Sequence, residues 1–226
     1  EISACLVGSE MCIRDREQMV AYWDGSPAVR ERLEAIAQAS AYVVLFLEYI
    51  PQSLQEWLTG QAAIGGEAVE SACSRVERGL RTGVSFMNSM GLLHFDAHFG
   101  NILTDGLHLY FADFGLATSP RFDLAEAESA FLDIHMSYDE CYTVTQLVNW
   151  LIKVYTGVSS PSDRNEYIRR CAEGANPITV PSSVAEVINR YAPIAVIMND
   201  FYWKLRRESR TAPYPVAEIQ RVCKPS

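Results

Sequence analysis

The 226-residue sequence lacks closely spaced cysteines and has little histidine. Its six cysteines never form a CxxC pair and only four histidines are present, so no zinc-ligand spacing occurs. Scattered thiols without a disulfide framework are typical of a reducing compartment. We therefore expect buried, reduced cysteines and no structural zinc site.

Long apolar runs are also missing. The longest uncharged stretch, Ala35 to Leu47, is too short and too polar to span a bilayer. No basic segment followed by an apolar run, the pattern of a signal peptide, is visible. These absences predict a cytoplasmic protein without a membrane partner.

Acidic residues outnumber basic residues. The chain has 19 Lys and Arg against 28 Asp and Glu, which leaves a net charge of -9. Because phosphate contacts need a basic face, this balance argues against a general nucleic-acid binder. It leaves room for a small basic pocket that holds one nucleotide. Hydrophobic residues at 49% and charged residues at 21% are typical of a globular protein with a substantial core.

The start of the chain contains a segment that fits no periodic pattern. Residues Ser9 to Arg16, with the sequence SEMCIRDR, resemble the peptide encoded when a sequencing adapter is read through in frame. An ordinary flexible arm is the alternative. We expect residues 1–16 to be a non-native segment, with an N-terminal remnant and a strand at 17–50 and a helical domain at 51–226.

The periodicity predicts a mainly α chain with one small β hairpin. Capping residues and apolar steps of three and four predict helices at 26–39, 53–58, 67–90, 124–134, 142–155, 164–172 and 183–203, the last bent at Pro193. A β-branched and aromatic run predicts a buried strand at Tyr42 to Glu48. Two short strands, at 102–103 and 107–112, are joined by Asp105-Gly106, a strong hairpin signal.

The residues with chemical potential lie in one window, HFDAHFGNILTDGLHLYFADFG, from His94 to Gly115. A tight hairpin brings its two ends together, so Asn101 and Asp113 can share one cation. A carboxylate and an amide oxygen are ligands that suit Mg²⁺ and leave room for phosphate oxygens. Asp96 then lies close enough to orient and deprotonate a hydroxyl group.

This constellation resembles the kinase-like phosphotransferases. Their HxDxxxxN loop is matched by His94, Asp96 and Asn101, and their DFG motif by 113–115. The resemblance covers about Tyr42 to Trp203. It implies an α+β kinase-like fold with a helical C-lobe, the cofactors ATP and Mg²⁺, and Asn101 and Asp113 as the metal ligands.

The same resemblance implies a nucleotide site around a hinge at 45–50, LFLEYI. Leu47 would be the gatekeeper residue. The backbone C=O of Glu48 and N–H of Ile50 would hydrogen-bond adenine, and Leu103 would form the floor of the pocket.

Two departures from the family pattern matter. The residues before Tyr42 contain no lysine and no glycine cluster, so the phosphate loop and strand lysine of an N-lobe are absent there. This predicts a truncated chain, or a protein without its ATP clamp, and Glu31 or Glu34 is either the paired helix Glu or an exposed carboxylate.

The second departure concerns the acceptor. His98 stands where protein kinases place a lysine, and no APE motif follows. The DxHxGN form of 96–101 is closer to aminoglycoside and choline kinases, whereas DFGLA at 113–117 is the protein-kinase spelling. We expect an ATP-dependent phosphotransferase acting on a hydroxyl of a protein Ser/Thr or of a small molecule; the alternative is a pseudokinase that binds without catalysis.

Several residues have a structural alternative. Asp96, Asn101 and Asp113 are also common turn formers, and the His94 ring is expected to hold the loop through backbone contacts. His98 either contacts phosphate or substrate as a catalytic residue, or is solvated. Asp139 either anchors the catalytic loop or is an ordinary helix N-terminal carboxylate.

Two further groups near the C-terminus follow the same reasoning. Tyr191, Tyr202 and Trp203 recur at helical spacing and are expected in the core. The basic cluster Lys204, Arg206, Arg207 and Arg210 is either a solvated helix end or a partner site.

Overall fold

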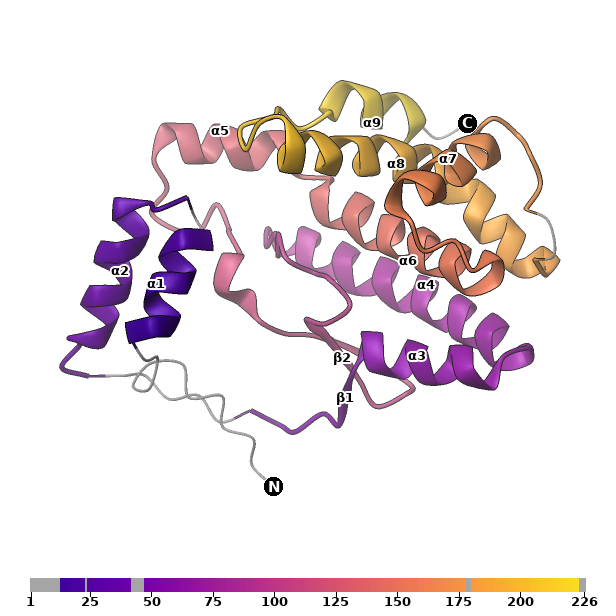
Figure 1. Ribbon diagram of the computed structural model, residues 1–226, viewed down its shortest axis with the longest axis horizontal. Coiled ribbons are helices and arrows are strands. Elements are labelled where there is room, and N and C mark those ends of the chain that lie inside the picture. The colour runs from indigo at the N-terminus through magenta and orange to yellow at the C-terminus, as the bar shows by residue number, and fades with distance from the viewer. Residues whose placement is uncertain (1–12, 23, 42–46, 178–179, 224–226) are drawn as a thin grey trace. The chain divides into compact units, whose positions relative to one another are not determined.

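The computed structural model describes residues 13–22, 24–41, 47–177 and 180–223. The chain divides into two compact units, Glu1–Tyr49 and Ile50–Ser226. It is mainly helical, with a three-stranded antiparallel sheet in the described part (Figure 1). Among the described residues, every helix is too short or too polar to cross a bilayer.

The first unit contains helices α1 (Ile13–Tyr22) and α2 (Pro27–Ala37). Pro27 at the first helical position confirms the predicted start of α2, although the Ser26 side chain makes no capping bond. Helix α1 begins inside Ser9 to Arg16, at Ile13. Arg30 forms a bidentate ion pair with Glu17 between the two helices.

The strand predicted at Tyr42 to Glu48 lies largely outside the described residues, because 42–46 are not among them. Leu47 and Glu48 are described and belong to no strand. Leu47 is 82% exposed. The predicted buried strand is therefore wrong for these two residues.

Helices make up most of the second unit. They are α3 (Leu54–Ile64), α4 (Glu67–Ser89), α5 (Glu126–Ile134), α6 (Tyr138–Thr156), α7 (Pro161–Ala172), α8 (Ser182–Arg207) and α9 (Val216–Val222), with a 3-10 turn η1 at Phe114–Leu116. A capping box between Ser53 and Glu56 starts α3, and Ser160 with Pro161 starts α7. Helix α9 was not predicted, and Pro193 lies inside α8 without ending it.

The core of this unit lies between α4, α6 and α8. Helix α4 buries one stripe with steps of three and four, namely Val69, Ala72, Cys73, Val76, Leu80, Val84 and Met87. These side chains pack into one cluster with the buried faces of α6 and α8, which include Leu147 and Ile188. Each fully buried Val, Leu, Ile or Met side chain contributes about 1.5–3 kcal/mol. The predicted core position of Trp203 is wrong: it is 45% exposed and stacks under the Arg207 guanidinium.

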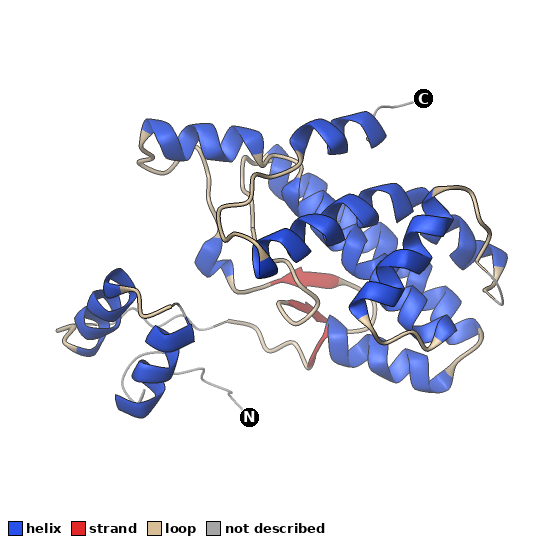
Figure 2. Ribbon diagram, turned by 45° about the horizontal axis from the view of Figure 1, so that its top comes forward, coloured by secondary structure: helices blue, strands red, loops and turns tan. Residues whose placement is uncertain are grey.

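Three short strands lie against α3 and α4 (Figure 2). They are β1 (Gln52–Ser53), β2 (Ile102–Thr104) and β3 (Leu109–Phe111), paired antiparallel in the order β1-β2-β3. The β2–β3 hairpin confirms the prediction from Asp105-Gly106, whereas β1 was missed. Gly79 and Gly83 of α4 face the hairpin, and a Cβ atom at either would meet Leu109 or Phe111. The hairpin approaches α4 closely because these two positions lack a side chain.

Candidate active site

The segment from His94 to Gly115 is closed at both ends by backbone pairing. A β-bridge joins Leu93 and Thr118, with N–H···O distances of 2.9 and 2.8 Å. At the open end of the hairpin, the Ala112 N–H donates to the Asn101 carbonyl at 2.8 Å. Asn101, just before β2, is therefore paired with Ala112, the residue that precedes Asp113.

The hairpin turn is held by Asp105. Its carboxylate accepts backbone N–H groups from Leu107 and His108 at 2.7 Å each. The hydrogen bond from the His108 side chain is the largest cause that holds the pKa of Asp105 well below its usual range. Gly106 adopts φ +89°, and Arg75 of α4 donates to its carbonyl. The turn is thus fixed to α4, which sets the position of the hairpin.

Asp139, at the first turn of α6, anchors the loop that carries Asp96. Its fully buried carboxylate accepts the backbone N–H of His94 at 2.5 Å and of Phe95 at 2.9 Å. Burial raises the pKa of Asp139, and these two N–H donors oppose that shift. Of the two alternatives for Asp139, the loop anchor is confirmed.

His94 links the Asp96 loop to the Asp113 segment. Its ring is fully buried, and Nε2 lies 2.9 Å from the Ala112 carbonyl. Since a carbonyl only accepts, Nε2 carries the proton, and Nδ1 is free to accept the Asp96 N–H at 3.3 Å. The ring also lies 4.7 Å from the Phe114 ring. The expected structural role of His94 through backbone contacts is confirmed.

Asn101 is bonded directly to Asp96. Its Nδ2 donates to the Asp96 carbonyl at 3.0 Å and to the Asp96 Oδ2 at 3.1 Å. The amide nitrogen is thereby committed to Asp96, which orients the amide oxygen away from it. This oxygen accepts no hydrogen bond from the described residues and remains free for another ligand.

His98 lies beside the same carboxylate. Its Nδ1 accepts the Gly100 N–H at 3.0 Å, so a neutral ring carries its proton on Nε2. That Nε2 is 4.0 Å from the Asp96 Oδ1, and both side chains are partly exposed. The ring therefore presents a donor next to Asp96 on the solvent side.

Asp113 has a left-handed backbone, with φ 57° and ψ 65°, which is uncommon for a residue other than glycine. Its Oδ1 accepts the Gly115 N–H at 3.4 Å and the residue is exposed. Phe95, next to Asp96, also has a positive φ, of 62°. Strained backbone persists where the surrounding structure fixes it, and such positions cluster at functional sites.

The side-chain oxygens of Asn101 and Asp113 are chemically suited to a magnesium ion. An Asn101 amide oxygen and an Asp113 carboxylate are hard oxygen ligands of the kind Mg²⁺ takes, together with waters and phosphate oxygens. Within the described part of the chain, no three His, Cys, Asp or Glu side chains gather closely enough to bind a metal ion by themselves.

The residues expected to contact adenine are divided between the two units. Leu47 and Glu48 belong to the first unit, and Ile50 begins the second. Leu103 is half-buried in β2, paired with Ser53 on one side and Tyr110 on the other. The structure thus brings Leu103 beside the segment that directly follows Ile50.

An aromatic wall next to Asp96 was missed at the sequence level. Burial raises the pKa of Tyr138 and of Tyr142, and the nearby Asp96 carboxylate adds to both shifts. The Phe95 ring lies 5.3 Å from that of Tyr138 and 5.6 Å from that of Phe131. The four-residue spacing of the two tyrosines, on either side of Asp139, is the sequence signal that could have revealed this face of α6.

Comparison of the chain with protein-family models gives no match, and comparison with curated proteins also gives none. The assignment of a function therefore depends on the residues and contacts described above.

Proposed function

We propose that residues 51–226 form the helical lobe of a kinase-like phosphotransferase that works in the cytoplasm, with 17–50 as the remnant of the smaller lobe. The reaction would move the γ-phosphoryl group of ATP to a hydroxyl of a protein Ser/Thr or of a small molecule. The observation that carries this proposal is the double hydrogen bond from Asn101 to Asp96, with Asp113 next to the residue paired to Asn101.

Each of these side chains has a defined part in the reaction. The acceptor hydroxyl oxygen attacks the γ-phosphorus, and the bond from that phosphorus to the β–γ bridging oxygen breaks. The hydroxyl proton passes to a carboxylate oxygen of Asp96. Asn101 holds this carboxylate in place, and the Nε2–H of His98 is available to donate to a phosphoryl oxygen.

Asn101 and Asp113 would hold Mg²⁺, which supplies charge neutralisation at the transferring phosphates when bound. The backbone of Glu48 and Ile50 and the side chains of Leu47 and Leu103 would contact adenine. Since the residues before Tyr42 include no lysine and no glycine cluster, this 226-residue chain would bind ATP more weakly than micromolar.

The test is Mg²⁺-dependent phosphoryl transfer from ATP by the protein expressed from its intact gene. Peptides, aminoglycosides and amino alcohols would serve as acceptors. We expect Asp96→Asn and Asp113→Asn each to lower kcat by about 10²–10⁴-fold with the fold retained, because they remove the base and a metal ligand. The matched control is Asp133→Asn, an exposed carboxylate on α5.

Wild-type turnover in either site variant would contradict the assigned roles. Nucleotide binding without turnover by the wild-type protein on any acceptor would favour the alternative, a pseudokinase that acts as a binding module.

A further inference from the structure

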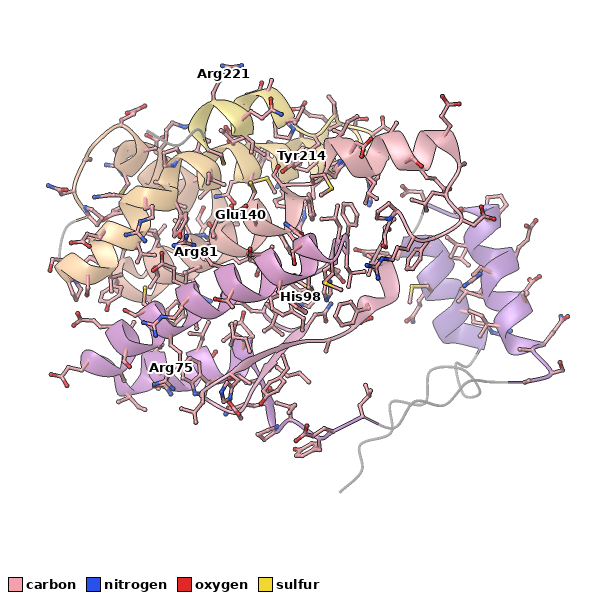
Figure 3. The ribbon with its side chains drawn as sticks, turned by 180° about the vertical axis from the view of Figure 1, so that it is seen from behind. Arg75, Arg81, His98, Glu140, Tyr214 and Arg221 are labelled. Carbon is pink, nitrogen blue, oxygen red and sulfur yellow. The ribbon has the colours of Figure 1, made fainter. Side chains whose placement is uncertain are left out.

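A groove with a volume of about 910 Å³ runs along α4. Its lining includes Glu140 from the start of α6 and Arg190 from α8, and excludes every residue of the His94 to Gly115 segment. In Figure 3, Arg81 and Glu140 are seen above helix α4, whereas His98 is seen below it. The groove is therefore separate from the candidate active site.

The length of the groove suits an extended peptide. Its α4 lining begins at Ser74 and ends at Ser89, and most of it recurs at steps of three and four residues. At a rise of about 1.5 Å per residue this face is about 22 Å long. An extended chain of about seven residues covers that length.

The groove carries a net positive charge, because its lining has three arginines and two glutamates. Arg78 and Arg81 are exposed, and neither forms a salt bridge with any described residue. Glu77, in contrast, is already compensated, since it pairs with Arg190 at 2.6 Å and accepts the Tyr191 hydroxyl at 2.8 Å. Two free guanidinium groups are thus concentrated in one groove of a chain whose net charge is -9.

The other lining residues indicate which class of partner fits the groove. Glu140 adds one carboxylate to the lining, so the groove favours a segment with a few separated carboxylates over a continuous polyanion such as RNA. Ser74, Thr82 and Ser85 offer hydroxyl groups that can pair with a peptide backbone. Phe86, in the same groove, is 64% exposed and gives an apolar contact.

We propose that this groove binds an acidic segment of a partner protein in an extended conformation, with its carboxylates on Arg78 and Arg81 and an apolar side chain on Phe86. The site does not depend on the phosphotransferase assignment. It would serve recruitment of a partner or a protein substrate rather than chemistry.

The test is fluorescence anisotropy of a labelled acidic peptide, with aspartates alternating with leucines, titrated with the 226-residue chain. A peptide with asparagine in place of aspartate is the neutral comparison. We expect binding of the acidic peptide alone, weakened by added salt because exposed charges are screened. Arg81→Glu should weaken binding by at least about tenfold, since it turns an attraction into a repulsion.

Arg221→Glu on α9 is the matched control, because it makes the same charge change at an exposed position outside the groove. It should leave the affinity within about twofold of wild type. Arg81→Gln, which removes the charge without reversing it, should show an intermediate loss, and circular dichroism checks that both Arg81 variants remain folded.

Four results would overturn the proposal: no binding of the acidic peptide, equal binding of the neutral peptide, an equal loss in Arg221→Glu, or tighter binding of an oligouridylate. Self-association of the chain that Arg81→Glu abolishes would also overturn it, because the occupant would then be a second copy.

Discussion

Removal of the Asp139 carboxylate should destabilise the second unit more than any exposed substitution. Its two oxygens accept the backbone N–H groups of His94 and Phe95, and the carboxylate is fully buried. Asp139→Ala leaves two donors in a buried region without a partner. Each unsatisfied donor costs about 1–3 kcal/mol, so we expect a loss of about 2–6 kcal/mol in the free energy of unfolding.

The Asp139→Asn variant distinguishes the contributions of these two hydrogen bonds. Its single carbonyl oxygen can accept one N–H, while its amide group faces the other, so a loss of about 1–3 kcal/mol is expected. Because burial raises the pKa of Asp139, the charge itself is disfavoured in the folded state, and removing it offsets part of this loss. The advantage of wild type over the Asn variant should therefore decrease as the pH rises from the usual pKa of Asp, about 4, through the raised value.

The assay is urea unfolding followed by circular dichroism at neutral pH, with thermal unfolding as a second measure. For a domain of this size, a loss of about 2–6 kcal/mol corresponds to a fall in Tm of roughly 4–24 °C. Asp133→Ala on α5 is the control and should change the free energy of unfolding by less than about 0.5 kcal/mol. An Asp139→Ala variant as stable as that control would refute the anchoring role.

Two further predictions concern packing and pH. Gly83→Ala should be less stable than Gly60→Ala by about 1–3 kcal/mol in urea unfolding, because both gain helix propensity but only the Cβ at 83 meets the Phe111 ring; equal stabilities would contradict the close approach of hairpin and helix. Burial lowers the pKa of His135, which stacks on Phe131 at 3.9 Å. His135 therefore takes up its proton more readily in the unfolded state, where its pKa has the ordinary value of about 6.5. The free energy of unfolding should fall as the pH drops from 7.5 to 5.5, and His135→Gln should reduce this pH dependence. An unchanged dependence in that variant would exclude His135 as its source.

Long periodic helices and the tight hairpin could be predicted from the sequence. The apolar stripe of α4 and the Asp105-Gly106 turn are local signals, and both elements were found within a few residues of the expected bounds. Helix ends were harder to place. Helix α6 begins at Tyr138 rather than at 142, because its first turn carries Asp139 and Glu140, which the apolar periodicity does not register.

Elements that depend on distant partners could not be predicted. Strand β1 has two residues and exists only because Gln52 and Ser53 pair with β2. The same holds for the site. The spacing of His94, Asp96 and Asn101 suggested their convergence, but the Asn101 to Asp96 bonds and the choice between two roles for Asp139 depend on tertiary contacts.

The central claim is that Asn101 and Asp113 hold one divalent ion beside Asp96. Electron paramagnetic resonance of Mn²⁺, titrated into the protein expressed from its intact gene with a non-hydrolysable ATP analogue, tests it most directly. The account predicts one nucleotide-dependent Mn²⁺ site that both Asn101→Ala and Asp113→Asn abolish and Asp133→Asn preserves. A Mn²⁺ site of unchanged affinity in the first two variants would contradict it.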